Sequence, residues 1–348
     1  MTSLRTARYR TPGAATALLI AIAAALTVGC ASRDPVAAGT AVIGLGADPA
    51  ARCTELLAPV PASDIAIPSG AARIESATLV AATPLAVAER GPTPAARITP
   101  ATPAHCRVIG SIDPIDPKAP AIRFQVNLPL QWNGRLVQYG GGGFNGTLIT
   151  AVGLPPAARF ETPSPLAQGY ITVGTDSGHQ TAQGQPPQAF ALNDEALVNF
   201  AHASYKKVHD VATLLAWRAY DRRPVKHYFV GSSEGGREGL TLAQRYPGDF
   251  DGIFSRVPVI HWTGLQHAGT RNGMATFGDG WLRPAQVKLV HDAVLAACDA
   301  GDGARDGIVS DAVACKQRFD GAALRWADGA PDDTCLNEAQ VKAVQTLH

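Results

Sequence analysis

The sequence predicts an α/β fold, and three stretches of the 348-residue chain carry this prediction. Residues 225–230 are rich in β-forming side chains, and they run through a small-residue turn into a helical pattern that we place near Glu238 and end at Pro247. Upstream, residues 122–128 alternate like a strand, and residues 135–139 form a second strand that ends in a glycine run. Strands that alternate with helices in this way are typical of α/β proteins.

The N-terminus is typical of an export signal. Three arginines precede an apolar run over 14–28 that is too short and too alanine-rich for a membrane span. We therefore expect a signal peptide over 1–30 and a flexible tether, rich in Ala, Gly and Pro, over 31–51. Residues 26–32 resemble a bacterial lipobox with its leucine one place early, so a lipid-modified Cys30 and simple export stay open as alternatives. The expected location is periplasmic, outer-membrane lipoprotein or secreted.

Composition excludes some functions and allows a full core. The chain is 46% hydrophobic, and its 30 basic and 29 acidic residues give a net charge of +1, which offers no electrostatic basis for binding nucleic acid. Residues 193–220 have the period of a long helix. Its expected buried stripe comprises Leu197, Phe200, Ala201, Val208, Val211, Ala212, Leu215 and Trp217.

Ser233 is the candidate nucleophile, because it is the serine of a Gly-x-Ser-x-Gly turn between a strand and a helix. A serine hydroxyl attacks well only when a tight turn exposes it beside backbone N–H groups that can hold an oxyanion. The N–H of Glu234 is the first such donor. The pattern alone is weak in a chain with 35 glycines, and the alternative is a plain glycine-rich turn.

The glycine run Gly140–Gly146 is the candidate second half of the oxyanion site. A strand that ends in four glycines leaves backbone amides uncovered, and we expect a second donor from Gly141, Gly142 or Gly143. A flexible loop is the alternative. A phosphate-binding loop is disfavoured, because no Gly-Lys-Ser/Thr follows.

From about Cys53 to the last residue, the chain resembles the tannase and feruloyl esterase family, which also includes mono(2-hydroxyethyl) terephthalate hydrolases. The resemblance rests on Trp132-Asn133-Gly134, the Gly140–Gly146 run, Gly174-Thr175-Asp176-Ser177-Gly178-His179, the Ser233 turn with Arg237-Glu238, and residues 244–252. It implies an α/β-hydrolase core with a lid inserted late in the chain, acting on esters of aromatic acids such as gallate or ferulate. We accordingly expect the core over 52–260 and part of the lid over 261–348.

The resemblance also implies a structural calcium site in the lid. Asp299, Asp302 and Asp306 would give side-chain oxygens, and Ala304 and Ile308 would give carbonyl oxygens. Several oxygen ligands on a glycine-punctuated loop suit calcium, although the spacing is not that of an EF-hand. A solvated acidic turn is the alternative.

Cysteine usage fits an exported protein. Spacing alone does not fix connectivity, but the family pattern implies the pairs Cys53–Cys106 and Cys298–Cys315, which leaves Cys335 over.

The chain departs from the family pattern in two ways. Many members have a cysteine where this chain has Ser232, bonded to another beside the catalytic histidine. The family's catalytic acid and histidine also lie beyond the lid, and we expect them beyond residue 348. His261 and His267, beside the start of the lid, are alternative general bases, and His179 is a candidate for substrate contact. Asp176, in the loop of His179, is expected to hold backbone amides.

These observations predict a serine carboxylic-ester hydrolase that forms an acyl-enzyme on Ser233 and acts on a small aromatic ester. The alternative is a truncated, catalytically inactive exported binding protein or a fragment of such an esterase. A metal-dependent hydrolase is disfavoured by the lack of nitrogen ligands. No nucleic-acid partner is expected, and membrane association is expected only through a lipid on Cys30.

Overall fold

The computed structural model describes residues 42–88, 97–159, 161–181, 183–326 and 333–348. The expected signal peptide, with Cys30, lies outside these residues. The tether expected over 31–51 is too long, because the fold begins at Ile43. Strand β1 (Ile43–Gly44) pairs with β7 (Gln131–Trp132), and Leu45 is buried in the core. The carboxylate of Asp48 then caps helix α2 (Pro49–Thr54). The small residues that suggested a tether instead form the first turns of the folded part.

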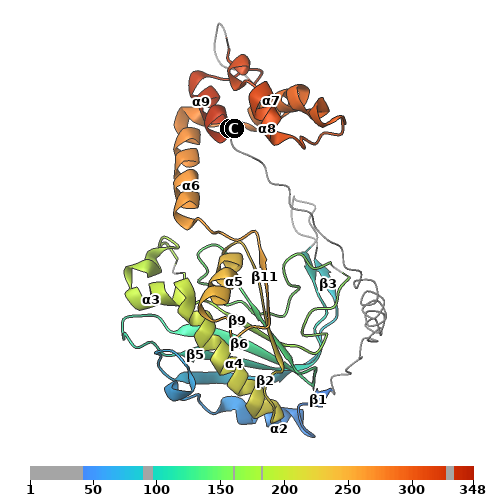
Figure 1. Ribbon diagram of the computed structural model, residues 1–348, viewed down its shortest axis with the longest axis vertical. Helices are drawn as coiled ribbons and strands as arrows, with labels where there is room; N and C mark the ends of the chain where they lie inside the picture. Colours follow the sequence, from blue (N-terminus) through green and yellow to red (C-terminus); the bar gives the residue numbers. More distant parts are fainter. Residues whose placement is uncertain (1–41, 89–96, 160, 182, 327–332) are drawn as a thin grey trace, which may run out of the picture. The chain divides into compact units, whose positions relative to one another are not determined.

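A seven-stranded mixed sheet, in the order β11-β10-β8-β9-β6-β5-β2, forms the centre of the fold (Figure 1). Strands β11, β10, β8 and β9 run parallel to one another, while β6, β5 and β2 continue the sheet with antiparallel pairing. The strands are β2 (Ala72–Val80), β5 (His105–Ile112), β6 (Ile122–Pro129), β8 (Arg135–Tyr139), β9 (Ile171–Thr175), β10 (Lys226–Ser232) and β11 (Gly252–Arg256), with a separate hairpin of β3 (Ala86–Ala88) and β4 (Arg97–Thr99). The sheet and its helices confirm the α/β prediction.

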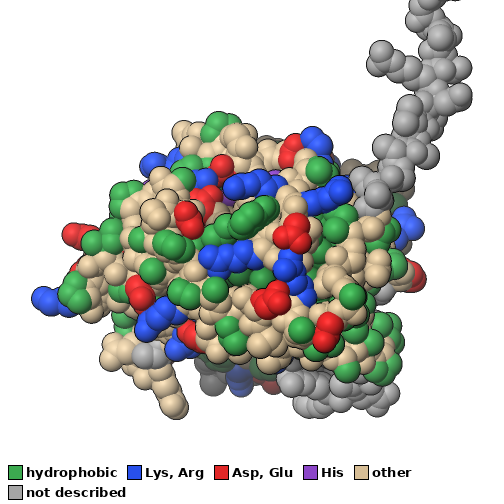
Figure 2. Space-filling view, turned by 90° about the horizontal axis from the view of Figure 1, so that it is seen from below, with side chains coloured by type: hydrophobic (Ala, Val, Ile, Leu, Met, Phe, Trp, Pro, Cys, Tyr) green, Lys and Arg blue, Asp and Glu red, His purple; other side chains and the backbone are tan. Residues whose placement is uncertain are grey.

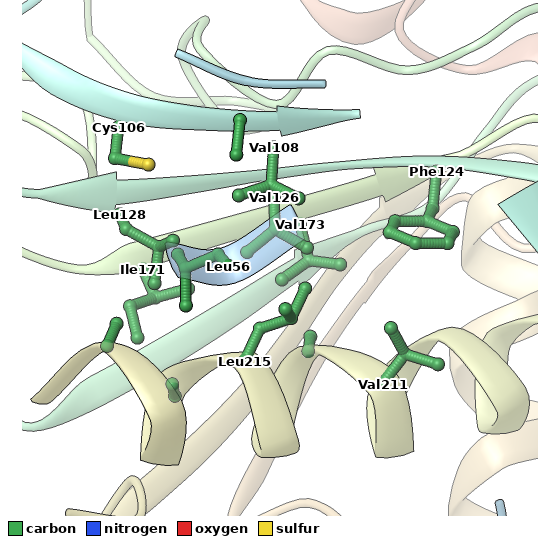
Figure 3. Packing of buried hydrophobic residues seen from close by; sticks show 14 of the residues in the cluster. Leu56, Cys106, Val108, Phe124, Val126, Leu128, Ile171, Val173, Val211 and Leu215 are labelled. Carbon is green, nitrogen blue, oxygen red and sulfur yellow. The ribbon is translucent and has the colours of Figure 1, made fainter. Parts of the chain in front are cut away.

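The helix expected over 193–220 forms in three parts: α3 (Asp194–Val198), a π-helical turn (Asn199–Ala203) and α4 (Ser204–Tyr220). Helix α4 lies across the sheet (Figure 1), and Figure 3 shows Val211 and Leu215 pointing at strand residues such as Val126 and Val173. Most of the expected stripe is buried or partly buried. The prediction is wrong for Leu197 and Trp217, which are 42% and 48% exposed.

Helix α5 (Glu234–Arg245) packs on the same face of the sheet as α4, since Leu242 and Tyr205 both contact Phe229 of β10. It begins four residues before the expected start near Glu238. The glycines at its first turn obscured that start, because glycine is a poor helix former. In the folded chain the helix therefore begins directly after Ser233.

Among the described residues from 262 onward, the regular elements are helices, apart from one isolated β-bridge between Arg325 and Leu336. The helices are α6 (Trp262–Thr276), α7 (Pro284–Cys298), α8 (Ala312–Arg318) and α9 (Glu338–Leu347). Single 3-10 turns occupy Glu55–Leu57, Ala62–Asp64, Ala189–Leu192, Gly278–Gly280, Asp299–Asp302 and Gly321–Leu324. Helices α7 and α9 share a small apolar cluster around Leu336, Val341 and Val344. This part of the chain thus has its own core, separate from that of the sheet.

Both expected disulfides form. Cys53–Cys106 joins α2 to β5, and Cys298–Cys315 joins the end of α7 to α8. Within the described residues, no helix is long and apolar enough to cross a membrane. On the face shown in Figure 2, basic and acidic side chains are interspersed with apolar ones, as the net charge of +1 leads one to expect.

Candidate active site

Ser233 occupies the sharp turn between β10 and α5. Its backbone has φ 60° and ψ −117°, a left-handed conformation that is strained for a residue with a side chain. The turn closes only because of its glycines: a Cβ on Gly231 would lie 2.1 Å from the carbonyl oxygen of Gly235. The first glycine of the Gly-x-Ser-x-Gly spacing therefore has a steric purpose, because a side chain there would collide with the first turn of α5.

Backbone hydrogen bonds fix Ser233 while its side chain stays exposed. Its N–H donates to the carbonyl of Arg256 at 3.0 Å, at the end of the neighbouring strand β11. Its carbonyl accepts from Arg237 at 3.1 Å and from Val259 at 3.3 Å. The residue as a whole is exposed. The arrangement presents a hydroxyl on a rigid backbone, as nucleophilic attack requires.

The N–H of Glu234 is the first of α5. The first N–H groups of a helix have no carbonyl partner within that helix, and the helix dipole favours negative charge in front of them. An oxyanion formed on a substrate at Ser233 would meet this donor.

The glycine loop lies directly against the first turn of α5. A Cβ on Gly140 would lie 2.8 Å from Cα of Gly235, and one on Gly235 would lie 2.8 Å from the carbonyl oxygen of Gly141. The loop and the Ser233 turn are therefore in backbone contact, with no side chain between them.

Of the three expected loop donors, the N–H of Gly141 already has hydrogen-bond partners within the protein. Its N–H donates to Oε2 of Glu238 at 3.0 Å and to the hydroxyl of Tyr205 at 3.1 Å. Gly142 and Gly143 are exposed at the tip of the loop. The expectation for Gly141 is therefore corrected, because its amide is occupied by a buried carboxylate, and the candidate second donors are Gly142 and Gly143.

Two buried carboxylates lie on α5 just beyond Ser233. Burial raises the pKa of Glu234 to about 7, although its hydrogen bond from Arg237 acts in the opposite direction. Arg237 also donates to the carbonyls of Phe200 and Ala201 in the π-helical turn. Burial likewise raises the pKa of Glu238, against which the donors from Asn145, Gly141 and Tyr205 act.

The loop after β9 contains Asp176 and His179, both buried. As expected, Asp176 holds backbone amides: its Oδ1 accepts from Arg123 at 3.0 Å and from Gly178 at 2.9 Å. His179 is only 2% exposed, its Nε2 lies 2.7 Å from the carbonyl oxygen of Phe144, and its ring stacks on another aromatic ring. His179 thus supports the residue that follows the glycine loop, and its expected contact with substrate stays a prediction.

The other histidines have partners elsewhere or lie on the surface. His202 bonds to the Tyr246 hydroxyl, and His209 bonds to His227 at 2.9 Å. His261 and His267, at the start of and within α6, are exposed. In the part of the chain that the structure describes, no histidine is hydrogen-bonded to the hydroxyl of Ser233. The general base is therefore not assigned to a residue here.

The acidic loop of the expected calcium site folds on itself. Its carboxylates accept N–H groups of the loop at 3.0–3.3 Å: Asp302 from Ala304 and Ser310, Asp306 from Ile308, and Asp299 from Gly307. Among the described residues, no group of three Asp, Glu, His or Cys side chains gathers in a metal-binding arrangement. The oxygen donors suit calcium chemically, but this conformation does not bring the three carboxylates together.

Comparison with known proteins shows to which family the chain belongs. The family model described as "Tannase and feruloyl esterase" matches residues 106–348. The chain belongs to the tannase and feruloyl esterase family. The resemblance drawn from the sequence is thereby confirmed, and so is the α/β-hydrolase fold class.

Three proteins similar to this chain illustrate the comparison. The chain is 39% identical over 297 residues to an uncharacterized esterase from Agrobacterium fabrum, covering 83% of this chain and 51% of the relative. It is 34% identical over 286 residues to the mono(2-hydroxyethyl) terephthalate hydrolase of Piscinibacter sakaiensis, covering 74% and 47%. Feruloyl esterase B from Aspergillus oryzae is a structural neighbour at a TM-score of 0.64, with 27% identity over 84% of this chain and 55% of that one. The chain spans about half the length of the curated relatives that it matches.

Sequence reasoning missed the buried cluster of Glu238, Asn145 and Tyr205. The sequence did contain a signal for this cluster. Glu238 lies among Gly235, Gly236 and Gly239, and a helix with so many small residues can pack close to its neighbours. A carboxylate at a close-packed position must find donors, and the nearby glycine loop carries bare N–H groups.

Proposed function

We propose that this chain is a serine carboxylic-ester hydrolase that cleaves esters of aromatic acids, of feruloyl or galloyl type, through an acyl-enzyme on Ser233. The observation that carries the proposal is the geometry of Ser233: an exposed hydroxyl on a strained strand-to-helix turn, in backbone contact with a glycine loop. Family membership supports the reaction class.

In the proposed reaction, Oγ of Ser233 attacks the ester carbonyl and gives its proton to a general base. The N–H of Glu234, with one from Gly142 or Gly143, holds the oxyanion. The tetrahedral species collapses with loss of the alcohol, which takes up the proton, and leaves the acyl group on Ser233. Water then attacks the acyl-enzyme and releases the acid.

An aromatic substrate fits the surroundings of the glycine loop. Phe144 follows Gly143 directly, and its ring meets that of Trp262 edge-on at 5.2 Å, with both side chains partly exposed. The names of relatives point the same way, since they include hydrolases of feruloyl and terephthalate esters. Offset and edge-on packing against such rings stabilises an aromatic ligand.

The second candidate is a catalytically inactive exported binding protein or a fragment of such an esterase. The observation that favours it is that no histidine among the described residues is hydrogen-bonded to Ser233. In a chain without a general base, several powers of ten in rate would be lost.

Hydrolysis of methyl ferulate and methyl gallate by the purified chain, beside Ser233→Ala, separates the two candidates. Turnover that disappears in Ser233→Ala supports the esterase. No turnover by the 348-residue chain, with activity only in a version extended by downstream coding sequence, supports the fragment.

We also propose that the loop over 299–308 takes up structural calcium, with Asp299, Asp302 and Asp306 among its ligands. The oxygen donors and the short glycine-punctuated loop support this. Calcium should raise the Tm of the chelator-treated chain, and Asp302→Asn should remove most of that rise. A Tm that does not respond to calcium would reject the proposal.

We further propose that the chain is exported. Its two disulfides support this, because they persist in oxidising compartments. Lipid attachment at Cys30 is tested by the mass of the mature N-terminus after expression in a bacterial host, with Cys30→Ala as the control. An N-terminus that keeps residues 1–29 would contradict both processing routes.

A further inference from the structure

Glu238 is a buried carboxylate whose hydrogen bonds reach back to the glycine loop. The residue is 2% exposed and lies one turn after Glu234 on α5. Its Oε2 accepts from the N–H of Gly141 at 3.0 Å, and its Oε1 accepts from Nδ2 of Asn145 at 2.6 Å. The hydroxyl of Tyr205 on α4 completes the cluster, since it lies 3.1 Å from the same N–H and bonds to the carboxylate. One side chain thus ties the loop, α4 and α5 together.

Stability alone does not explain a carboxylate at this position. Burying a charge is costly, and apolar side chains of similar size often stabilise a core as well or better. The neighbouring cation, Arg237, forms its ion pair with Glu234 instead. Two of the three donors around Glu238 belong to the loop, so the carboxylate chiefly specifies where the loop lies.

The position of the loop matters because the loop and the Ser233 turn meet with no side chain between them, while the other hydrogen bonds that described residues make to the loop lie at its ends, at Gly140, Phe144 and Gly146. Gly140 and Gly235 meet backbone to backbone, so a small slide of the loop changes the distance from its amides to Ser233. Once the N–H of Gly141 points to Glu238, the orientation of that peptide is set, and the amides that follow lie at the exposed tip. Oxyanion donors act only within a narrow range of distances.

We infer that Glu238 is a positioning residue: it holds the Gly140–Gly146 loop against the Ser233 turn, so that Gly142 or Gly143 supplies the second oxyanion donor. The inference rests on the proposed role of Ser233. It assigns to Glu238 no contact with substrate and no proton transfer.

The variant Glu238→Gln tests the inference, because it keeps the size of the side chain but turns an NH₂ group toward a loop donor. Glu195→Gln is the matched control. Glu195 is also a largely buried carboxylate that holds a loop, accepting from the N–H groups of Ile115 and Asp116, but this loop is a different one. Asn145→Ala removes a donor from the loop side and leaves α5 intact.

We expect kcat for methyl ferulate to fall 10- to 100-fold in Glu238→Gln and to fall in Asn145→Ala, with KM within about twofold, consistent with a displaced oxyanion donor. Glu195→Gln should lower the Tm by a similar amount and leave kcat within about twofold. If Glu238→Gln keeps its kcat and loses only Tm, as the control does, the role of Glu238 is structural and the inference is overturned.

Hydrogen exchange keeps the inference testable apart from turnover. Amide exchange over residues 139–146 should quicken at least tenfold in Glu238→Gln and stay unchanged in Glu195→Gln. Unchanged exchange over 139–146 overturns the inference even in an active enzyme. Faster exchange in a chain that hydrolyses neither ester supports the positioning role, while the absence of turnover counts against the proposed activity of this chain.

Discussion

The contact between the glycine loop and α5 makes Gly235→Ala an informative perturbation. A Cβ at this position would lie 2.8 Å from the carbonyl oxygen of Gly141, whereas ordinary contacts begin at 3.4 Å. The loop and the helix must therefore separate by about 0.6 Å, the difference between these distances. Donors in an oxyanion site work over a range of about 0.4 Å, from about 2.7 to 3.1 Å. The loop donor should consequently move out of range.

The size of the effect follows from the loss of one donor, which costs about 10²–10³ in kcat, or about 2.7–4 kcal/mol. Because the helix can take up part of the movement, we expect the lower end, near 100-fold, with little change in KM. Stability should change less than activity, since alanine gains about 1 kcal/mol over glycine inside a helix and offsets part of the clash.

The assay is hydrolysis of methyl ferulate, with the Tm of each variant measured alongside. Gly239→Ala on the same helix is the control, because its Cβ would meet the side chains of Ile253 and Phe229 at 3.0–3.3 Å rather than the loop backbone. Side chains can yield, so kcat should stay within about twofold. A folded Gly235→Ala variant with wild-type kcat would refute the loop as a source of the second donor.

Three further predictions concern stability. Burial raises the pKa of Glu234 to about 7, against the opposing ion pair with Arg237, so the protonated side chain stabilises the folded state. This contribution to the free energy of unfolding is fully present below the unfolded pKa of Glu234 and is lost as the pH rises through 7. Glu234→Gln should therefore flatten the fall in Tm between pH 5 and 8, and an identical slope would contradict this. Replacing Cys53 and Cys106 by alanine should cost about 4 kcal/mol of unfolding free energy, from the chain entropy of the 53-residue separation, as measured by urea unfolding. Leu215→Ala should cost about 2–5 kcal/mol in the same measurement, because the side chain is fully buried against the sheet, and a cost below 1 kcal/mol would be inconsistent with that packing.

The strand-to-helix turn at Ser233 could be predicted from the sequence because its determinants are local. Ser233 and the two glycines around it lie within five residues, and the strand before them is apolar enough to recognise alone. The glycine loop was likewise visible as a run. Which of its N–H groups is free to act as a donor was not visible, because the N–H of Gly141 is occupied by Glu238, which lies 97 residues further along the chain. Only the folded sheet brings that carboxylate beside the loop.

The long helix shows the same limit in another way. A single helical period predicts a stripe, and it correctly places Val208, Val211 and Leu215 against the sheet. Leu197 precedes the π-helical turn over 199–203, which shifts the phase of the helix, so that its side chain faces outward. Trp217 lies two positions after Leu215, about 200° around the helix, and apolar character alone had placed it in the stripe.

The hydrolysis experiment can separate the contribution of the oxyanion site from that of a general base. The candidate nucleophile and the candidate oxyanion donors, Glu234 with Gly142 or Gly143, lie on the turn and loop that the sheet supports, whereas no base is assigned. In serine hydrolases, binding and the oxyanion site alone leave a residual acceleration of about 10³–10⁴ over water when a member of the triad is removed. A rate of that size that persists in Ser233→Ala would mean that the site binds and polarises the ester without forming an acyl-enzyme. A higher rate that Ser233→Ala abolishes would require a base within these 348 residues, and His261 and His267 would then be the first side chains to replace.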